Sequence, residues 1–178
     1  CIRDRKFGSE KIMTNTPAIT MDDKAAILLE EARAAHENYL IKQQDADLEK
    51  AIEYYIDAIK VNPSISESYY RLASLLLMKG QISIEGALEQ CQTALTLEPN
   101  NVNAHIYSGY FQCLNGNFEE AEKEFKLAVS NSGKNSARPR LFLSKVLFSR
   151  IKNHDSSVKD VMKFLYYFLS GSMMIMWD

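Results

Sequence analysis

The chain has 178 residues, of which 46% are hydrophobic, and a formal net charge of −2 at neutral pH. This length fits one domain or an array of a few repeats, and the hydrophobic fraction excludes wholesale disorder. The small net charge argues against bulk attraction to nucleic acid. The three cysteines have no Cys-x-x-Cys spacing, so they signal neither a zinc site nor a redox pair.

The first part of the chain predicts a polar leader followed by two helices. Residues 1–19 mix charged residues with Gly, Ser, Thr and Pro and show no apolar period, so we expect a flexible leader, with partly non-native sequence as an alternative. Thr20 and Asp23 resemble a capping box at the start of a helix over about 22–41. After a polar turn, a second helix is expected over about 48–61.

The next two helices are predicted from a cap, a turn glycine and apolar spacing. Ser64 and Glu67 form the pattern of a capping box for a helix over about 66–79. Gly80 ends that helix, since glycine is common just after helix C-termini. A further helix is expected over about 84–97.

Apolar periodicity predicts two more pairs of helices toward the C-terminus. The first pair spans about 102–115 and 118–130. The second spans about 139–151 and 156–169, with a proline in the first turn of its first helix.

The last part of the chain, Phe164 to Trp177, is heavily apolar. Its run of about 14 residues is shorter than the roughly 17–25 residues that a helix needs to span a bilayer. We expect it to pack on the preceding helices or on another subunit. A membrane-surface or truncated spanning segment, and non-native disorder, are the alternatives.

One pattern of large, small and turn residues occurs twice in the middle of the chain. The first copy is Tyr69, Leu72, Ala73, Leu76, Gly80, Ala87, Cys91, Ala94 and Pro99. The second copy is His105, Ser108, Gly109, Gln112, Gly116, Ala121, Phe125 and Ala128. A period of about 34 residues indicates stacked helix–turn–helix units. The small residues let neighbouring helices approach closely.

This pattern resembles the tetratricopeptide repeat (TPR) family, whose turn and inter-repeat corner are similar to residues 116–121 and 97–101. The resemblance implies an all-α fold, a short right-handed TPR-type solenoid of helix–turn–helix repeats. It divides the chain into three repeats over 20–135, at about 20–65, 66–101 and 102–135. Residues 136–170 would form a degenerate fourth repeat or cap, and 171–178 an apolar tail.

The resemblance also implies a non-catalytic, cytoplasmic scaffold that binds a protein partner in a concave groove. In the family the first helix of each repeat lines this groove. The corresponding residues here are Tyr70, Ser74, Leu77, Met78, Asn103, Ile106, Tyr110, Cys113 and Leu114. The first repeat adds Leu29, Arg33 and His36. Such an apolar surface suits an extended or helical peptide with apolar anchors.

Some family members bind the acidic C-termini of heat-shock chaperones with Lys, Asn and Arg side chains. The positions matched to these here are Leu29, Arg33, Ser74, Asn103 and Tyr107. Among these positions only Arg33 carries the positive charge that an acidic tail requires, so we expect no clamp for an acidic chaperone tail.

A second candidate surface is basic. Six residues occur without an acidic residue between positions 131 and 154, namely Lys134, Arg138, Arg140, Lys145, Arg150 and Lys152. A solvated helix face is the simpler interpretation; an acidic partner, nucleic acid or anionic lipid is the alternative. Together with the apolar end, the basic residues suggest a membrane-associated adaptor as the alternative function. Self-association through the apolar end is a third hypothesis.

Nothing in the sequence predicts catalysis, a metal or a cofactor. The three histidines lie far apart, and no HExxH, GxSxG, GxxxxGK[ST] or GxGxxG motif occurs. His105 is expected to be a partly buried structural residue. Glu119, Glu120, Glu122 and Glu124 are expected on a solvated face near a helix N-terminus, where acidic side chains are favourable.

Overall fold

A computed structural model describes residues 20–133, 136–152 and 162–169 of the chain. Within these ranges all regular structure is helical. The labelled helices are α1 (Met21–Lys42), α2 (Asp45–Val61), α3 (Ser66–Met78), α4 (Ile84–Leu97), α5 (Val102–Leu114), α6 (Phe118–Asn131) and α7 (Ala137–Lys152). Residues 162–169 are also helical. The predicted leader, 1–19, and the predicted tail, 171–178, lie outside the described residues.

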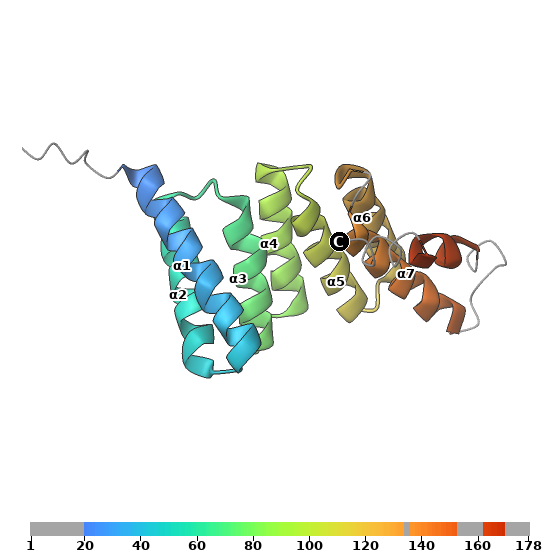
Figure 1. The fold of residues 1–178 in the computed structure, drawn as a ribbon, viewed down its shortest axis with the longest axis horizontal. Coiled ribbons are helices and arrows are strands. Elements are labelled where there is room, and N and C mark those ends of the chain that lie inside the picture. Colours follow the sequence, from blue (N-terminus) through green and yellow to red (C-terminus); the bar gives the residue numbers. More distant parts are fainter. Residues whose placement is uncertain (1–19, 134–135, 153–161, 170–178) are drawn as a thin grey trace, which may run out of the picture.

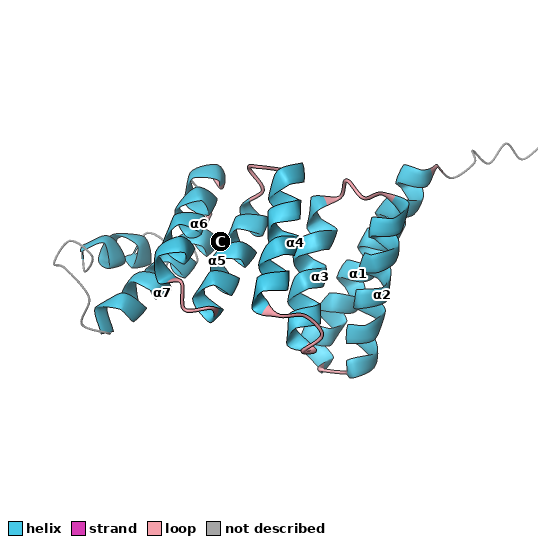
Figure 2. Cartoon of the chain, turned by 180° about the vertical axis from the view of Figure 1, so that it is seen from behind, coloured by secondary structure: helices cyan, strands magenta, loops and turns pink. Residues whose placement is uncertain are grey.

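The helices stand side by side in a row from α1 to α7, and each packs against the next one in the chain (Figure 1). Seen from behind, the short loops connect neighbouring helices alternately at the upper and the lower ends of the helices (Figure 2). Pairing is closest within α1–α2, α3–α4 and α5–α6. The all-α prediction is therefore confirmed. The right-handed sense of the superhelix and the division into repeats stay predictions.

The start of α1 confirms the predicted capping box. The Asp23 N–H donates to Thr20 Oγ1 at 3.1 Å, and the Thr20 N–H donates to Asp23 Oδ2 at 3.0 Å. These bonds satisfy backbone donors that have no partner inside the helix. The second helix, α2, begins at Asp45 rather than near Leu48, because two acidic residues occupy its first turn, where the helix dipole favours them.

The start of α3 contradicts the second predicted capping box. Its N-cap is Ile65, and no side chain accepts a hydrogen bond there. The Glu67 carboxylate contacts the guanidinium groups of Arg33 and Arg71 instead. Two cations attract a carboxylate more strongly than one backbone N–H does.

The small residues of the repeated pattern lie where helices touch, as predicted. Ala73, Ala87 and Ala121 are fully buried. A Cβ atom placed on Gly109 of α5 would approach the Phe125 ring of α6 to 2.9 Å, which is closer than carbon atoms pack. Glycine at this position therefore sets the distance between the two helices.

Three buried clusters form the core, and successive clusters share one helix. The first joins α1 and α2 to Leu72 and Leu75 of α3. The second joins Tyr70 and Ala73, on the other side of α3, to α4 and α5. The third joins α5, α6 and α7 around Phe125. Because α3 and α5 each pack into two clusters, the stack is continuous.

The prediction for the acidic residues of α6 is partly wrong. Glu119 and Glu120 are exposed in the first turn, as expected. Glu122 is buried, and its carboxylate pairs with Lys126 Nζ at 2.6 Å. Glu124 Oε2 lies 2.7 Å from Nδ1 of the buried His105. The predicted structural role of His105 is confirmed, because this contact joins α5 to α6.

Candidate partner-binding cleft

A hollow with a volume of about 600 Å³ lies along the first helices of successive pairs. We call it the central cleft. Its walls come from α1, α3, α5 and the start of α7. The lining residues are His36, Glu37, Leu40, Arg71, Ser74, Leu77, Met78, Asn103, Tyr107, Tyr110, Phe111, Leu114 and Arg138. The shared helices of the core thus also build the cleft.

Large apolar side chains of the central cleft are open to solvent. Leu40 is 57% exposed, Met78 55%, Leu114 48% and Tyr110 46%. They come from three different helices and line one hollow. An apolar surface that gathers several such residues marks an interaction site more often than scattered single residues do.

Polar atoms lie on the floor of the same cleft. The Ser74 hydroxyl donates to the Arg71 backbone carbonyl at 2.7 Å and is thus satisfied within α3. The Asn103 side chain is hydrogen-bonded to Tyr70. His36 is buried, and its Nδ1 atom has no hydrogen-bond partner. Burial, and then the charge of Arg71, lower the pKa of His36, so the ring is neutral near pH 7.

Some of the residues that the sequence assigned to a groove line the central cleft, and others do not. Those that line the central cleft are Ser74, Leu77, Met78, Asn103, Tyr110 and Leu114. Tyr70 and Ile106 are buried in the core, so their predicted position on the groove surface is wrong. The Tyr70 ring stacks on Tyr107 with 5.1 Å between ring centres, which fills the space beneath the cleft. Cys113 lines a smaller hollow of about 270 Å³ against α6 and α7.

The groove residues predicted from the first repeat also lie in different places. His36 lines the central cleft, whereas Leu29 packs against the first core cluster. Arg33 donates from Nε to Glu67 Oε1 at 2.9 Å and from Nη2 to Glu67 Oε2. Its guanidinium is therefore already bound within the protein.

Several residues that line the central cleft were absent from the predicted groove, although their helical spacing indicates that they share a face with predicted residues. Arg71 precedes Ser74 by three positions, so the two share one face of α3. Leu40 follows His36 by four positions on α1. Choosing Tyr70 instead of Arg71 is an error of one position, which rotates the assignment by about 100° around the helix.

The predicted basic residues whose side chains are described, Arg138, Arg140 and Lys145, have different surroundings. Arg138 lines the central cleft. The Lys145 ammonium lies 5.6 Å from the centre of the Phe142 ring, a cation–π contact. Lys134 lies outside the described residues, and the side chains of Arg150 and Lys152 in α7 are likewise not described. Arg140 is half-buried.

Part of the predicted apolar end packs on α7. The Phe148 and Phe164 rings lie 5.5 Å apart, and Phe164 packs against the third core cluster. Residues of both helices, among them Phe148, Phe164 and Phe168, also line a mostly apolar hollow of about 400 Å³. Among the helices that the structure describes, none has the length and apolar character to cross a membrane. The remainder of the apolar end lies outside the described residues.

No group of three or more His, Cys, Asp and Glu side chains is arranged to hold a metal ion within 20–133, 136–152 and 162–169. The described cysteines, Cys91 and Cys113, are free. Burial raises the pKa of the Cys91 thiol to about 12 and that of Cys113 to about 11, so both thiols are protonated near neutral pH. Neither thiol has the low pKa of a reactive nucleophile.

Comparison with known proteins identifies the repeat and the fold. The family model described as tetratricopeptide repeat matches residues 40–65. The crystal structure of MamA superposes with a TM-score of 0.60 at 16% identity, covering 86% of this chain and 79% of that one. The first TPR of Spaghetti (RPAP3), bound to the HSP90 peptide SRMEEVD, superposes with a TM-score of 0.58 at 19% identity, covering 71% and 94%. The TPR2B domain of yeast Sti1, in a complex with pHsp70, superposes with a TM-score of 0.56 at 23% identity, covering 70% and 99%.

Proposed function

We propose that this chain is a tetratricopeptide repeat protein and serves as a non-catalytic scaffold that binds a partner peptide or helix in its central cleft. The main support is the set of exposed apolar side chains, Leu40, Met78, Tyr110 and Leu114, that line one hollow. A peptide that inserts apolar side chains there would remove this surface from water at roughly 25 cal/mol per Å². A polar rim of Glu37 and Arg138 would orient it.

The absence of catalytic activity belongs to the same proposal. The titratable residues that line the central cleft are His36, Glu37, Arg71, Tyr107, Tyr110 and Arg138. The buried histidine there, His36, has a lowered pKa, and its Nδ1 atom has no hydrogen-bond partner to orient the ring. A nucleophile with an adjacent base, the usual requirement for covalent catalysis, is not found in this cleft.

The related TPR domains of RPAP3 and Sti1 are in complexes with an HSP90 peptide and with pHsp70. We propose that the partner of this chain belongs to a different class. Arg33, the residue with the appropriate chemistry, is bound by Glu67, and the wall of the cleft consists largely of apolar side chains. Apolar anchors would therefore supply most of the affinity.

The experiment that tests the cleft selects peptides from a displayed random library on the purified chain. Binding of each selected peptide is then measured for the wild type and for Met78→Ser/Leu114→Ser. Both residues are exposed, so the substitutions remove apolar contact area with little effect on folding. We expect affinity to fall by about tenfold or more, since two apolar contacts of about 1 kcal/mol each are lost.

The control replaces two exposed leucines that lie outside the cleft, Leu97→Ser/Leu127→Ser, at 38% and 46% exposure. It should bind the selected peptides as the wild type does. Equal binding by all three proteins would place the interaction elsewhere. Weaker binding by the control alone would indicate the face formed by α4 and α6.

A further inference from the structure

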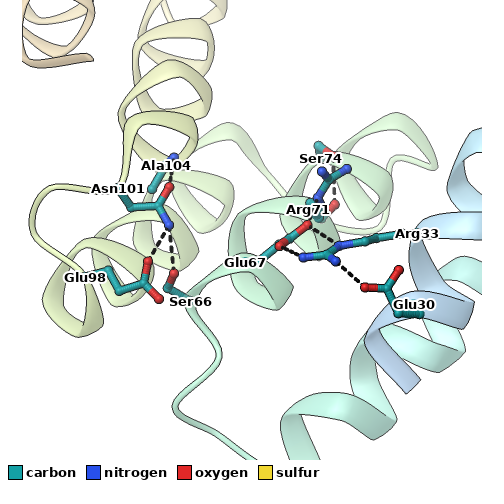
Figure 3. A network of polar contacts seen from close by, with 9 residues as sticks. All are labelled: Glu30, Arg33, Ser66, Glu67, Arg71, Ser74, Glu98, Asn101 and Ala104. Carbon is teal, nitrogen blue, oxygen red and sulfur yellow. Dashed lines mark hydrogen bonds and ion pairs between the residues drawn. The ribbon is translucent and has the colours of Figure 1, made fainter. Parts of the chain in front are cut away.

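An ionic cluster connects α1 to α3 (Figure 3), and one of its members, Arg71, lines the central cleft. Glu67 lies at its centre. Its Oε1 atom accepts from Arg33 Nε at 2.9 Å, and its Oε2 atom accepts from Arg33 Nη2. Arg71 Nε lies 2.6 Å from Glu67 Oε1, as an ion pair without hydrogen-bond geometry. Glu30 Oε1 contacts Arg33 Nη1 at 2.5 Å.

The cluster is electrically balanced. It contains two guanidinium groups and two carboxylates, so its formal charges cancel. Burial alone would raise the pKa of Glu67, but the hydrogen bond from Arg33 and the charge of Arg71 lower it below its usual value. The Glu67 side chain is only 18% exposed, whereas that of Glu30 is 70% exposed. Glu67 is therefore the carboxylate that balances the positive charge of the arginines at the position where water screens charges least.

The cluster extends to the floor of the cleft through Arg71. This residue lines the central cleft beside Ser74 and His36, whereas Glu67 lies behind it and does not line the cleft. An arginine at the floor of a peptide site would normally attract an acidic partner. Here the Glu67 carboxylate already contacts one edge of the Arg71 guanidinium. Arg71 therefore offers hydrogen-bond donors at the floor of the cleft but little net charge.

We propose that Glu67 sets the charge specificity of the central cleft by serving as an internal counter-ion that disfavours acidic peptides. This inference rests on the proposed function and adds a partner class, peptides with apolar anchors and uncharged polar residues between them. A peptide carboxylate that approached Arg71 would meet a cluster already neutralised by Glu67. It would lose its hydration without gaining a full charge partner.

The test uses two synthetic fluorescein-labelled peptides of equal length with leucines at the same positions. The Glu probe has glutamates between the leucines, the Gln probe has glutamines, and both end in an amide. Affinities are measured by fluorescence anisotropy for the wild type and for Glu67→Gln. We expect the wild type to bind the Gln probe more tightly. In Glu67→Gln, which leaves both arginines in place, we expect the affinity ratio of the Glu probe to the Gln probe to rise about tenfold.

The matched control is Glu30→Gln, which removes one negative charge from the same cluster at an exposed position that does not contact Arg71. Its affinity ratio should stay within about twofold of the wild-type value, because water screens this charge. A rise as large as that of Glu67→Gln would overturn the specific role of Glu67. Circular dichroism checks that each variant is folded.

A measurement on the wild type alone tests the inference if Glu67→Gln does not fold. In the wild type the two probes should lose affinity equally between low and high NaCl. A steep loss for the Glu probe alone would show that the cleft attracts carboxylates, which contradicts the inference. If both probes bind and the ratio of their affinities is the same in the wild type and both variants, the inference is overturned but the proposed cleft is not. If the wild type binds neither probe, both proposals fail.

Discussion

At the scale of single residues, the two contacts of His105 favour its protonated form. Its Nδ1 atom lies 2.7 Å from Glu124 Oε2, and its Nε2 atom lies 3.0 Å from the Pro99 carbonyl oxygen. Both partners accept hydrogen bonds, so both ring nitrogens are satisfied only when each bears a proton. The hydrogen bond with Glu124, partly opposed by burial, raises the pKa of His105.

This raised pKa predicts a stability that depends on pH. A group whose folded-state pKa lies above its unfolded value stabilises the fold fully below the unfolded value, about 6.5 for histidine. The stabilisation is then lost as pH rises through the folded-state value. We expect urea unfolding to show the largest difference between the wild type and His105→Gln near pH 6, with a smaller difference at higher pH.

A second variant completes this measurement. Glu124→Gln should cost about 1–2 kcal/mol near pH 6 and should remove most of the pH dependence assigned to His105. His36 has a lowered pKa, so its contribution changes with the opposite sign, and comparing variants cancels it. A stability difference for His105→Gln that stays constant or grows with pH would contradict the assignment.

At the scale of the elements, helix starts depend on which side chains are free to cap them. Ser83 caps α4 by accepting from the Gly86 N–H at 3.1 Å. Asn101 caps α5 in the same way, and its amide also donates to Ser66 and Glu98, which joins three helices at one corner (Figure 3). Ser64 precedes α3 at the spacing of a capping box, yet it does not cap that helix.

The two serines provide a matched pair of substitutions. Ser83→Ala should lower the free energy of unfolding by about 1 kcal/mol, because it removes the acceptor of an otherwise unpaired backbone N–H. Ser64→Ala should change it by less than about 0.5 kcal/mol, as expected for an exposed residue without a special role. Urea denaturation measures both, and an equal loss would show that Ser64 also caps a helix in solution.

At the scale of the whole molecule, the core is a series of three clusters joined by shared helices. Each helix pair packs mainly on its neighbours, and α1 and α2 share no cluster with α6 or α7. In such arrays stability is approximately a sum of local terms and nearest-neighbour interfaces. Damage at one end should therefore remain partly local.

Two fully buried aromatic residues at opposite ends of the stack test this expectation. Phe125→Leu removes ring atoms from the third cluster, and Tyr55→Leu does the same in the first. Each should cost about 1–2 kcal/mol through lost packing. Native-state hydrogen exchange should show lost protection in α5–α7 for Phe125→Leu and in α1–α2 for Tyr55→Leu. Uniform loss across all helices in both variants would indicate one cooperative unit.

The positions of the helices were largely predictable, because the signals are local. Apolar residues recur every three or four positions on one face, and Thr20 and Gly80 mark a helix start and a helix end. A close helix contact at Gly109 could also be anticipated, since a small residue in the repeated pattern indicates such a contact, whereas its partner Phe125 is seen only in the structure. These features require only the order of neighbouring residues.

The sequence by itself thus determined that the chain forms stacked helical pairs, because periodicity, caps and small residues act over a few positions. Only the tertiary structure decided which side chains line the central cleft and which charges remain available there. Tyr70 and Arg71 are adjacent in the chain, but one is buried and the other lines the cleft. The pairing of Arg33 with Glu67 joins residues 34 positions apart. No local pattern encodes such a contact, since it exists only when α1 and α3 lie side by side.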